Sequence, residues 1–486
     1  MLRGRIVADP GARSNGTNGT RSRRPAARWP AALAVEPALA YPSTARKDRH
    51  RGQVETTFFD RDLETLDRAS LKSRQEAALS RLMASLGSNP FYRAKLADAA
   101  PALDAVRTLE DLSRLPCTSK QELVDSQQRR PPFGELLSYP LRRYRHYHRT
   151  SGTSGQPLHW LDTEEDWETW IRCWAQVYRG AGVTEDDLVF CAFSFGPYIA
   201  HWTAMAGAER VGAMRLSGGG MSSRQRLDAI VDSGATVVVC TPTYALHLAE
   251  IASRHGIDLA GSPVRVTIHA GEPGASVPNV KRRIEEAWGA RCFDHAGATE
   301  VGAWAFDCQA PNGSIHLNEL EFIFEVIDPG DGRPVADGKS GELVVTTLGR
   351  LGMPVIRYRT GDLARRLSAP CACGRTLARI DGGVLGRTDD MFIVRGVNLY
   401  PAALDDVIRG VGGIVEYEVE IRGAQVVNDV LIRFESEEGL SPRDVADSIV
   451  RAFRARFDIR VGAEPTAAGS LPRYELKARR YKRRST

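Results

Sequence analysis

The feature that most constrains the fold is an alternation of short β-branched runs with segments of helical periodicity. The runs "DLVFCAFSF", "ATVVVCTP", "VRVTIHAGE" and "RCFDHAGATE" follow one another between residues 187 and 300, with helical patterns between them. Strands joined by helices run parallel, because a crossover helix returns the chain to the same end of the sheet. The alternation therefore predicts an α/β domain on a largely parallel sheet.

A smaller unit follows the segment "GRTDDMFIVRG". Its pattern restarts with a helix in "PAALDDVIRGV", strands in "VEYEVEIRG" and "DVLIRFES", and a helix in "SPRDVADSIVRAFRARF". These elements predict a compact α+β domain of normal size. We expect a disordered N-terminal extension over residues 1–52, rich in Arg, Pro, Gly, Ser and Ala, then a large domain over residues 53–388 and a small domain over residues 389–486.

Composition narrows the class of protein. A chain of 486 residues with 42% hydrophobic content is expected to bury a large core in more than one domain. The net charge is only +5, and the basic runs "RSRRPAARW" and "KARRYKRRST" lie at the two ends, which favours solvated tails over a nucleic-acid-binding arm. Eight cysteines are too few for a disulfide scaffold and indicate a reducing compartment, the cytoplasm.

Targeting signals are weak. No apolar run approaches the roughly 18 residues that a membrane-spanning helix needs. The segment "SRRPAARWPAALAVEPALA" resembles a twin-arginine export signal, but Trp29, Pro30, Glu36 and Pro37 interrupt what should be its apolar region. We therefore expect a soluble protein without membrane or nucleic-acid partners.

The stretch "RTSGTSGQP", from Arg149 to Pro157, suits the binding of phosphate. Its glycines permit positive φ and leave backbone N–H groups bare, while its Ser and Thr hydroxyls add donors. Taken alone, it fits equally well a flexible turn before a helix that begins near Thr163. No lysine follows Gly155, so the stretch is not a Walker A loop.

In their order along the chain, the motifs resemble those of the adenylate-forming ligases. "RTSGTSGQP" resembles their phosphate loop, "DHAGATEVG" their metal-and-adenine motif, "YRTGDL" their ribose motif, "GRTDDMFIVRGVNLYP" their interdomain hinge and "GSLPRYELKARR" their catalytic-lysine segment. "SNPFYRAKL" and "AGEPG" are similar to the phenylacetate-CoA ligase family in particular. The resemblance covers about residues 54–482. It implies a large N-terminal adenylate-forming domain with mixed sheets, followed by a small, mobile α+β C-terminal domain. It also implies an enzyme that uses ATP and Mg²⁺ to convert a carboxylic acid into an acyl-adenylate and then transfers the acyl group to coenzyme A.

The resemblance also implies roles for single residues in the first half-reaction. Lys477 would neutralise the charge that develops when the carboxylate attacks the α-phosphate, because two anions must meet there. On sequence alone, a lysine in this basic tail is as simply a solvated side chain. Thr299 would contact the α-phosphate, and Glu300 would help to hold Mg²⁺, a cation that prefers oxygen ligands. The phosphate loop would contribute Thr150, Ser151, Gly152, Thr153, Ser154 and Gly155.

Further residues are assigned to the nucleotide and to the hinge. Asp362 would accept hydrogen bonds from the ribose hydroxyls, although an ordinary Gly-Asp turn would look the same in sequence. Arg387 would reach the ribose or the phosphates, and the small domain would turn about Asp389. One wall of the adenine site would consist of Gly271, Glu272 and Pro273.

The sequence departs from the family pattern at two positions. Ala296 stands where an aromatic residue commonly stacks on adenine, so either His295 or a neighbouring residue compensates, or ATP binds more weakly. Gln156 replaces the lysine that usually follows the last glycine of the phosphate loop, for which we expect a modest effect.

The acid pocket is expected in the segment "FSFGPYIAHW". Phe195, Tyr198 and His201 would line a flat slot for an aryl or arylacetic acid, although a lone histidine is often a structural hydrogen bonder. A second aromatic group recurs at helical spacing and indicates either core packing or an aromatic pocket or subunit contact, the latter in a homodimer. It consists of Trp167, Trp170, Trp174 and Tyr178.

Two clusters of soft ligands are consistent with zinc. Cys308, His316, Cys371 and Cys373 would close a tetrahedral structural site, a pattern that phenylacetate-CoA-ligase-like proteins share. Their spacing is not that of a common zinc finger, so unliganded thiols remain an alternative. The simplest interpretation of the other cysteines is that of buried apolar residues: Cys117, Cys173, Cys191, Cys240 and Cys292.

Two alternatives to transfer onto coenzyme A stay open. Related enzymes pass the acyl group to an amine or to a carrier-protein thiol, and no motif here fixes the acceptor. A catalytically degenerate nucleotide-binding protein is the alternative of another class.

Overall fold

The structure is a computed structural model that describes residues 57–99, 105–150, 156–194, 196–311, 313–394, 397–422, 429–474 and 477–484. The chain divides into two compact units, residues 1–42 and residues 43–486, and all the described residues belong to the second. The predicted N-terminal extension therefore lies outside the described residues.

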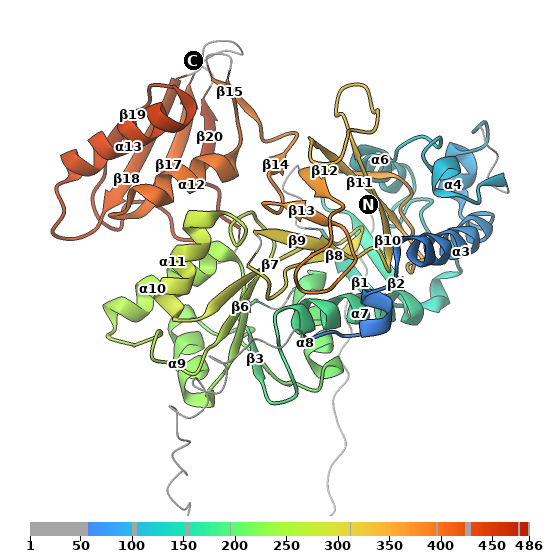
Figure 1. The fold of residues 1–486 in the computed structure, drawn as a ribbon, viewed down its shortest axis with the longest axis horizontal. Coiled ribbons are helices and arrows are strands. Elements are labelled where there is room, and N and C mark those ends of the chain that lie inside the picture. The colour runs from blue at the N-terminus through green and yellow to red at the C-terminus, as the bar shows by residue number, and fades with distance from the viewer. Residues whose placement is uncertain are drawn as a thin grey trace, which may run out of the picture. The chain divides into compact units, whose positions relative to one another are not determined.

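One half of the main sheet is parallel (Figure 1). Its strands are β3 (Leu188–Cys191), β4 (Met214–Ser217), β5 (Val237–Cys240), β6 (Val266–His269) and β7 (Arg291–Ala298). They lie in the order β7-β6-β5-β3-β4, and each neighbouring pair is parallel. The predicted α/β class with a largely parallel sheet is confirmed for this half.

The sheet continues from β7 into an antiparallel half, which makes it mixed. The order runs on through β8, β9, β13, β12 and β11 to β10, while β14 pairs with β12. The strands are β8 (Gly302–Phe306), β9 (Ser314–Leu317), β10 (Phe322–Ile327), β11 (Ser340–Thr347), β12 (Tyr358–Leu367), β13 (Arg379–Asp381) and β14 (Gly386–Arg387).

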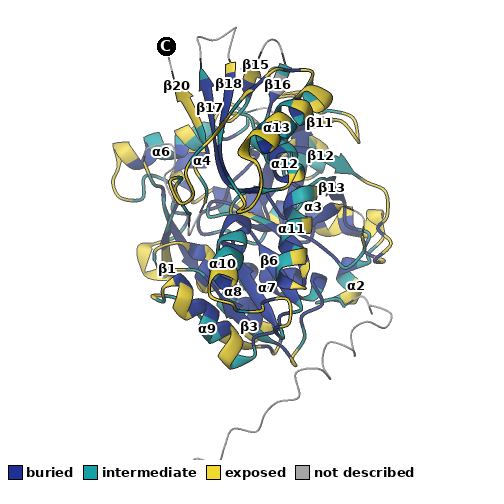
Figure 2. Ribbon diagram, turned by 90° about the vertical axis from the view of Figure 1, so that its left-hand side faces the viewer, coloured by how far each residue is buried: buried dark blue, intermediate teal, exposed yellow. Residues whose placement is uncertain are grey.

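Helices cover both faces of the parallel strands. Val237 and Val239 of β5 pack into the core cluster that contains α7 and α8, whereas Val238 and Cys240 pack into the cluster of α9, α10 and α11. Because successive side chains of a strand point to opposite faces, β5 is buried on both sides; Figure 2 shows β6 as similarly buried. The helices are α7 (Glu164–Gly180), α8 (Ile199–Arg210), α9 (Ser223–Ser233), α10 (Pro242–Arg254) and α11 (Pro278–Trp288).

Helix α7 begins where the sequence predicts. The Thr163 hydroxyl accepts a hydrogen bond from the backbone N–H of Asp166, and the Asp166 carboxylate accepts one from the N–H of Thr163, which together form a capping box. Trp170, Trp174 and Tyr178 are at most 3% exposed, which favours core packing for the aromatic group. Trp167 is only partly buried and stacks on His146.

The N-terminal part of the described chain packs against the antiparallel half of the sheet. Its elements are α2 (Arg61–Glu64), α3 (Arg68–Leu86), α4 (Pro90–Lys95), α5 (Leu109–Leu112), α6 (Lys120–Arg129), the 3₁₀ helix η2 (Leu141–Arg143), and the antiparallel strands β1 (Tyr144–Arg149) and β2 (His159–Thr163). The side chain of Gln75 in α3 donates hydrogen bonds to the carbonyls of Glu319 and Phe322. Among the described residues, the helices lack the length and apolar character needed to cross a membrane.

The C-terminal elements form a smaller α+β unit with its own core. Two helices pack on a sheet of order β19-β18-β17-β20, and the core draws only on residues 392–481. The predicted helices and strands are confirmed here. The elements are β15 (Phe392–Val394), β16 (Val397–Leu399), α12 (Pro401–Val411), β17 (Ile414–Arg422), β18 (Asp429–Ser436), α13 (Pro442–Phe457), β19 (Gly462–Pro465) and β20 (Tyr481–Arg484).

Candidate active site

The sequence motifs gather where the parallel strands end. The segment 192–198 follows β3, Thr241 follows β5, and the segment 270–273 follows β6. The carboxyl ends of parallel strands meet at one edge of a sheet, and in open α/β sheets ligands bind in the crevice outside that edge. The topology therefore places the predicted nucleotide and acid contacts in one region.

Lys477 reaches this edge from the C-terminal unit. A Cβ atom added to Gly271 would lie 3.5 Å from Lys477 Cε, and Gly271 has φ +96°, which disfavours any other residue. The surrounding protein lowers the pKa of Lys477 by removing solvent, while the charges of Glu272 and Asp362 raise it. The residue as a whole is nevertheless exposed.

Glu272 ties the C-terminal segment to α10. Its carboxylate accepts hydrogen bonds from the backbone N–H groups of Ala478, at 2.8 Å, and Thr243, at 2.9 Å. Further contacts join the units: Arg480 Nη1 donates to Thr243 Oγ1, Asn279 donates to Asp406, and Arg473 forms an ion pair with Glu250. Glu272 is thus the group that holds Lys477 beside Gly271. Pro273, the third predicted wall residue, follows directly.

Asp362 and Arg387 lie opposite each other on paired strands. Asp362 of β12 is the register partner of Arg387 of β14, and Arg387 Nη1 lies 3.2 Å from Asp362 Oδ1. Burial raises the pKa of Asp362 to about 6, against the lowering effect of the Arg387 and Lys477 charges. Gly361 has φ +76°, and a Cβ there would lie 2.8 Å from Arg387 Nη2, so the turn requires glycine.

The predicted hinge residue is held by the same arginine. Arg387 Nε and Nη2 donate to the two carboxylate oxygens of Asp389 at 2.8 and 3.1 Å. Asp389 is 61% exposed at its side chain, so this bidentate pair lies at the surface. The geometry links the ribose motif to the start of the small unit through one side chain.

Glu300 is buried and paired with a cation that the sequence motifs do not reveal. It is 4% exposed, and its Oε1 lies 3.0 Å from Lys120 Nζ and 3.3 Å from the donating hydroxyl of Tyr358. Burial, followed by the Glu300 charge, raises the pKa of Tyr358. Lys120 is the first residue of α6 and lies far from every motif in the sequence, so no local pattern predicts its role.

Thr299 is positioned through its backbone. Its carbonyl accepts a hydrogen bond from Arg350 Nη1 at 3.0 Å. Arg350 is itself buried and forms a pair with Asp162, and the Arg350 charge helps to lower the pKa of Asp162 against the raising effect of burial. The Arg350–Asp162 pair therefore anchors the turn that carries Thr299 and Glu300.

The structure buries His295. Its Nδ1 lies 2.8 Å from the carbonyl oxygen of Ala305, its ring centroid lies 4.6 Å from that of Trp174, and burial lowers its pKa to about 4. His295 is only 4% exposed, so little of its ring is available for stacking on adenine. The neighbouring Ala296 is half-buried.

The phosphate loop lies between β1 and β2. Thr150 is buried, and its hydroxyl accepts a hydrogen bond from the backbone N–H of Leu158 at 2.9 Å. The other predicted loop residues, Ser151, Gly152, Thr153, Ser154 and Gly155, lie outside the described residues. Gln156, in place of the family lysine, accepts a hydrogen bond from Gln128 Nε2 at 2.9 Å.

The predicted acid-slot residues occupy different environments. Tyr198 is 44% exposed at the start of α8, His201 is buried with its Nε2 3.3 Å from Ser217 Oγ, and Phe195 lies outside the described residues. Burial, followed by the charge of Arg226, lowers the pKa of His201. Both effects favour the neutral form of the His201 imidazole.

The four predicted zinc ligands come together in the antiparallel half. Cys308 Sγ lies 3.8 Å from Cys371 Sγ, and Cys373 Sγ lies 3.3 Å from His316 Nε2. The four ligand atoms lie within 4.8 Å of one another, and all four residues are buried. Sulfurs bound to a tetrahedral zinc at ~2.3 Å are about 3.8 Å apart, so the cluster fits this metal. All eight cysteines are free, and Cys117 is only half-buried, which corrects the expectation that it is a core residue.

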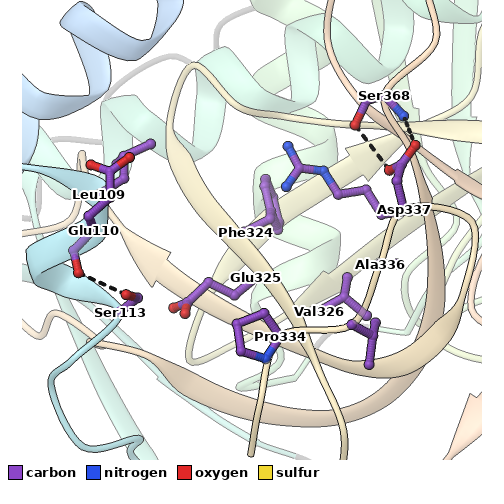
Figure 3. A pocket seen from close by; sticks show the side chains of 12 residues that line it. Leu109, Glu110, Ser113, Phe324, Glu325, Val326, Pro334, Ala336, Asp337 and Ser368 are labelled. Carbon is purple, nitrogen blue, oxygen red and sulfur yellow. Dashed lines mark hydrogen bonds between the residues drawn. The ribbon is translucent and has the colours of Figure 1, made fainter.

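Two surface hollows lie outside this constellation. One, of about 370 Å³, is lined by residues such as Phe324, Glu325 and Asp337 and holds none of the predicted site residues (Figure 3). The other, of about 380 Å³, lies beside β1 and is lined by His146, Trp167 and Trp202 among others.

Comparison with known proteins places the chain among enzymes that bind AMP. The model of the AMP-binding enzyme family matches residues 149–350, and that of the AMP-binding enzyme C-terminal domain matches residues 396–483. A phenylacetate-coenzyme A ligase of Thermus thermophilus is 33% identical over 78% of this chain and 85% of its own length. One of Escherichia coli is 31% identical over 86% of this chain and 96% of its own length.

Solved structures extend the likeness to the arrangement in space. A 2-hydroxyisobutyryl-CoA ligase in its postadenylation state, in complex with 2-HIB-AMP, is 30% identical, covers 87% of this chain and 92% of its own, and has a TM-score of 0.83. The same ligase with 2-HIB-AMP and CoA in the thioesterification state has a TM-score of 0.66 over equal shares of the chains. This chain is thus more similar in structure to the postadenylation state.

Proposed function

Because the chain belongs to the family of phenylacetate-coenzyme A ligases, among the AMP-binding enzymes, we propose that it activates an aryl or arylacetic acid with ATP and transfers the acyl group to coenzyme A. One observation carries the proposal: Lys477 lies beside Gly271 at the ends of the parallel strands, and the next residue, Ala478, donates a hydrogen bond to Glu272. The chain is an acid–thiol ligase.

In the first half-reaction, a carboxylate oxygen attacks the α-phosphorus of ATP and pyrophosphate leaves. Lys477 would donate hydrogen bonds to the carboxylate and the α-phosphate, and so stabilise negative charge that develops between them. Thr299 would contact the α-phosphate, held by the hydrogen bond from Arg350 to its carbonyl. The loop from Thr150 to Gly155 would bind the β- and γ-phosphates through N–H and hydroxyl donors.

Glu300 is the residue that fits Mg²⁺. It offers a buried carboxylate next to Thr299, and an oxygen ligand of this kind suits a hard cation. At present Lys120 neutralises its charge and the Tyr358 hydroxyl donates a hydrogen bond to it, so the buried carboxylate is not left unpaired. When bound, Mg²⁺ would neutralise phosphate charge during the attack.

The nucleoside would be held by the paired strands β12 and β14. Asp362 would accept hydrogen bonds from the ribose hydroxyls, and Arg387 would contact the ribose or the phosphates. The adenine would lie against Gly271, Glu272 and Pro273. His295 would support the adenine site from within the core and would not stack on the base, because its ring packs on Trp174.

In the second half-reaction, the thiol of coenzyme A attacks the acyl carbonyl carbon and AMP leaves. The small unit over residues 389–486 would rotate about Asp389 and withdraw Lys477 from the site. The hydrogen bond from the Ala478 N–H to Glu272 joins the small unit to the large one, and such a rotation would break and re-form it. The hydrogen bond from the Thr243 N–H lies within the large unit and would persist.

The four-ligand cluster of Cys308, His316, Cys371 and Cys373 would hold a structural zinc. All four coordination positions come from the protein, so the metal would have no open position for chemistry. His316 Nδ1 lies 3.3 Å from the carbonyl of Leu377, the kind of outer contact that orients a metal-binding imidazole.

The test is pyrophosphate release from ATP with a panel of acids, followed by addition of coenzyme A. Acid-dependent release and conversion of the adenylate to a thioester support the proposal. Adenylate that only an amine or a carrier protein discharges would contradict the coenzyme A half and leave adenylation standing. ATP binding without release for any acid would favour a degenerate nucleotide-binding protein.

A further inference from the structure

Arg226 of α9 is a fully buried cation beside the predicted acid slot. It is 1% exposed, as are Arg350 and Arg375. Each of the other two has a carboxylate partner, Asp162 for Arg350 and Glu64 for Arg375. Among the described residues, Arg226 has no carboxylate within ion-pair distance.

The partners of Arg226 are all neutral. Nε donates to the carbonyl of Gly218 at 3.0 Å, Nη1 to the hydroxyl of Tyr244 at 2.7 Å, and Nη2 to the hydroxyl of Ser194 at 3.1 Å. The guanidinium also lies over the Tyr244 ring, 5.1 Å from its centroid. Three of its five N–H donors are used in this way, and one remains on each terminal nitrogen. That pair suits the two oxygens of a carboxylate.

A charge removed from water is costly unless an opposite charge compensates for it. The missing partner is therefore expected to be a ligand. Ser194, which accepts from Nη2, is exposed and lies shortly after β3, so the guanidinium contacts the end of this strand where the sequence places the acid slot.

The strand order places Arg226 and Lys477 over different parts of the same edge. Lys477 lies beside Gly271 and Thr241, which follow β6 and β5. Arg226 contacts the segments that follow β3, β4 and β5. Because the strands run in the order β6-β5-β3-β4, an acid that lies along the edge has one end at Lys477 and the other at Arg226. His201 borders the second end, and its pKa is lowered by burial and by the Arg226 charge.

We infer that Arg226 determines substrate specificity, and that the acid carries a second carboxylate at the end remote from the one that is activated. The inference rests on the proposed function and narrows its substrate class to dicarboxylic acids. Arg226 would bind the second carboxylate through its two remaining N–H groups, beside the hydroxyls of Ser194 and Tyr244.

The experiment compares matched pairs of acids in the pyrophosphate-release assay with the full chain. The pairs are phenylacetate with 4-carboxyphenylacetate, and hexanoate with adipate. We expect kcat/KM of the wild type to favour the diacid of at least one pair by about 10- to 100-fold, the range of a charge-assisted hydrogen-bonded pair. Arg226→Gln should bring this ratio to about one, and Arg226→Lys should retain part of it. Arg224→Gln, an exposed arginine of the same helix paired with Asp228, is the control and should keep the wild-type ratio.

Two outcomes overturn the inference while the proposed function stands. In one, the wild type favours the monoacid of both pairs. In the other, Arg226→Gln lowers kcat/KM for both acids of a pair by the same factor, which identifies Arg226 as a structural tie between loops. If no acid releases pyrophosphate, the proposed function fails instead. The thermal shift that each acid causes then decides the inference: stabilisation by the diacid alone, lost in Arg226→Gln, supports it, and equal shifts overturn it.

Discussion

Lys120 Nζ lies 3.0 Å from Glu300 Oε1, so a cation already occupies the carboxylate that the sequence assigns to Mg²⁺. Lys120 is 37% exposed at its side chain and Glu300 5%, which means that the lysine can move into solvent more easily than the glutamate. The pair compensates the buried charge of Glu300 before any substrate binds. It also makes the lysine a competitor of the metal.

The first prediction is that Lys120→Met reduces the Mg²⁺ concentration needed for half-maximal adenylation. Removing a partly exposed ion pair of this kind should shift that concentration by about 2- to 5-fold, because such pairs contribute about 1 kcal/mol or less. The measurement is pyrophosphate release titrated with Mg²⁺. Lys72→Met, which removes an exposed ion pair with Glu110, is the control. An unchanged Mg²⁺ requirement in Lys120→Met would mean that Lys120 and the metal do not compete.

The contrast between Lys120 and Lys477 shows what the sequence can reveal. Lys477 lies in a segment that resembles a family motif, so its place at the strand edge could be anticipated. Lys120 is an isolated residue at the start of a helix, and only the folded chain brings it to Glu300. Arg226 is a similar case, because burial without a carboxylate partner is a property of the tertiary structure.

The fold was predictable for a related reason. The β-branched runs around β3, β5 and β6 have the pattern of strands that are buried on both faces, and the periodic segments between them give the helices directly. The joining of strands β10 to β13 to the same sheet as the parallel strands depends on the long-range pairing of β13 with β9, which no local pattern encodes. The burial of His295 could not be predicted from the sequence, because Trp174, which packs on its ring, belongs to a helix far away in the chain.

The second prediction concerns Lys477. Lys477→Ala should slow adenylate formation by about 10²- to 10³-fold, since loss of one preorganised group that stabilises transition-state charge has this size. Transfer from a supplied acyl-adenylate to coenzyme A should be largely retained, because the lysine serves only the first half-reaction. Rapid-quench assays of each half-reaction measure the two rates separately. Equal losses in both would argue against this assignment.

The third prediction is that Asp389→Pro impairs thioester formation more than adenylation. Proline fixes φ, and rotation of the small unit needs backbone freedom at this position. The substitution also removes the bidentate pair with Arg387, so Asp389→Asn is the matched control that weakens the pair and leaves the backbone free. If both variants lose the same share of rate in each half-reaction, the loss comes from the missing Asp389 side chain and not from restricted rotation at the hinge.

The fourth prediction concerns the pH dependence of ATP binding. The pKa of Asp362 is raised to about 6 by burial, so its carboxylate becomes protonated as the pH falls below 6 and can no longer accept two ribose hydrogen bonds. KM for ATP should rise by about 5- to 10-fold between pH 7 and pH 5, and Asp362→Asn should flatten that profile. The folded state binds this proton more tightly than the unfolded state, so the contribution of Asp362 to stability falls as the pH rises from about 4 to 6. A flat ATP profile in the wild type would contradict the ribose assignment.

The last prediction is that the purified protein contains about one zinc per chain, bound by the cluster of Cys308, His316, Cys371 and Cys373. Cys371→Ser or Cys373→Ser should lower the free energy of unfolding by roughly 3 to 5 kcal/mol, because loss of a structural metal is among the most destabilising changes. Cys117→Ser, at a half-buried cysteine outside the cluster, is the control and should retain the metal. Metal analysis and thermal unfolding test this, and kcat per folded molecule should stay near the wild-type value because no coordination position is open to substrate. Protein purified without chelator that contains no zinc, or Cys371→Ser with wild-type stability, would identify the cluster as free thiols.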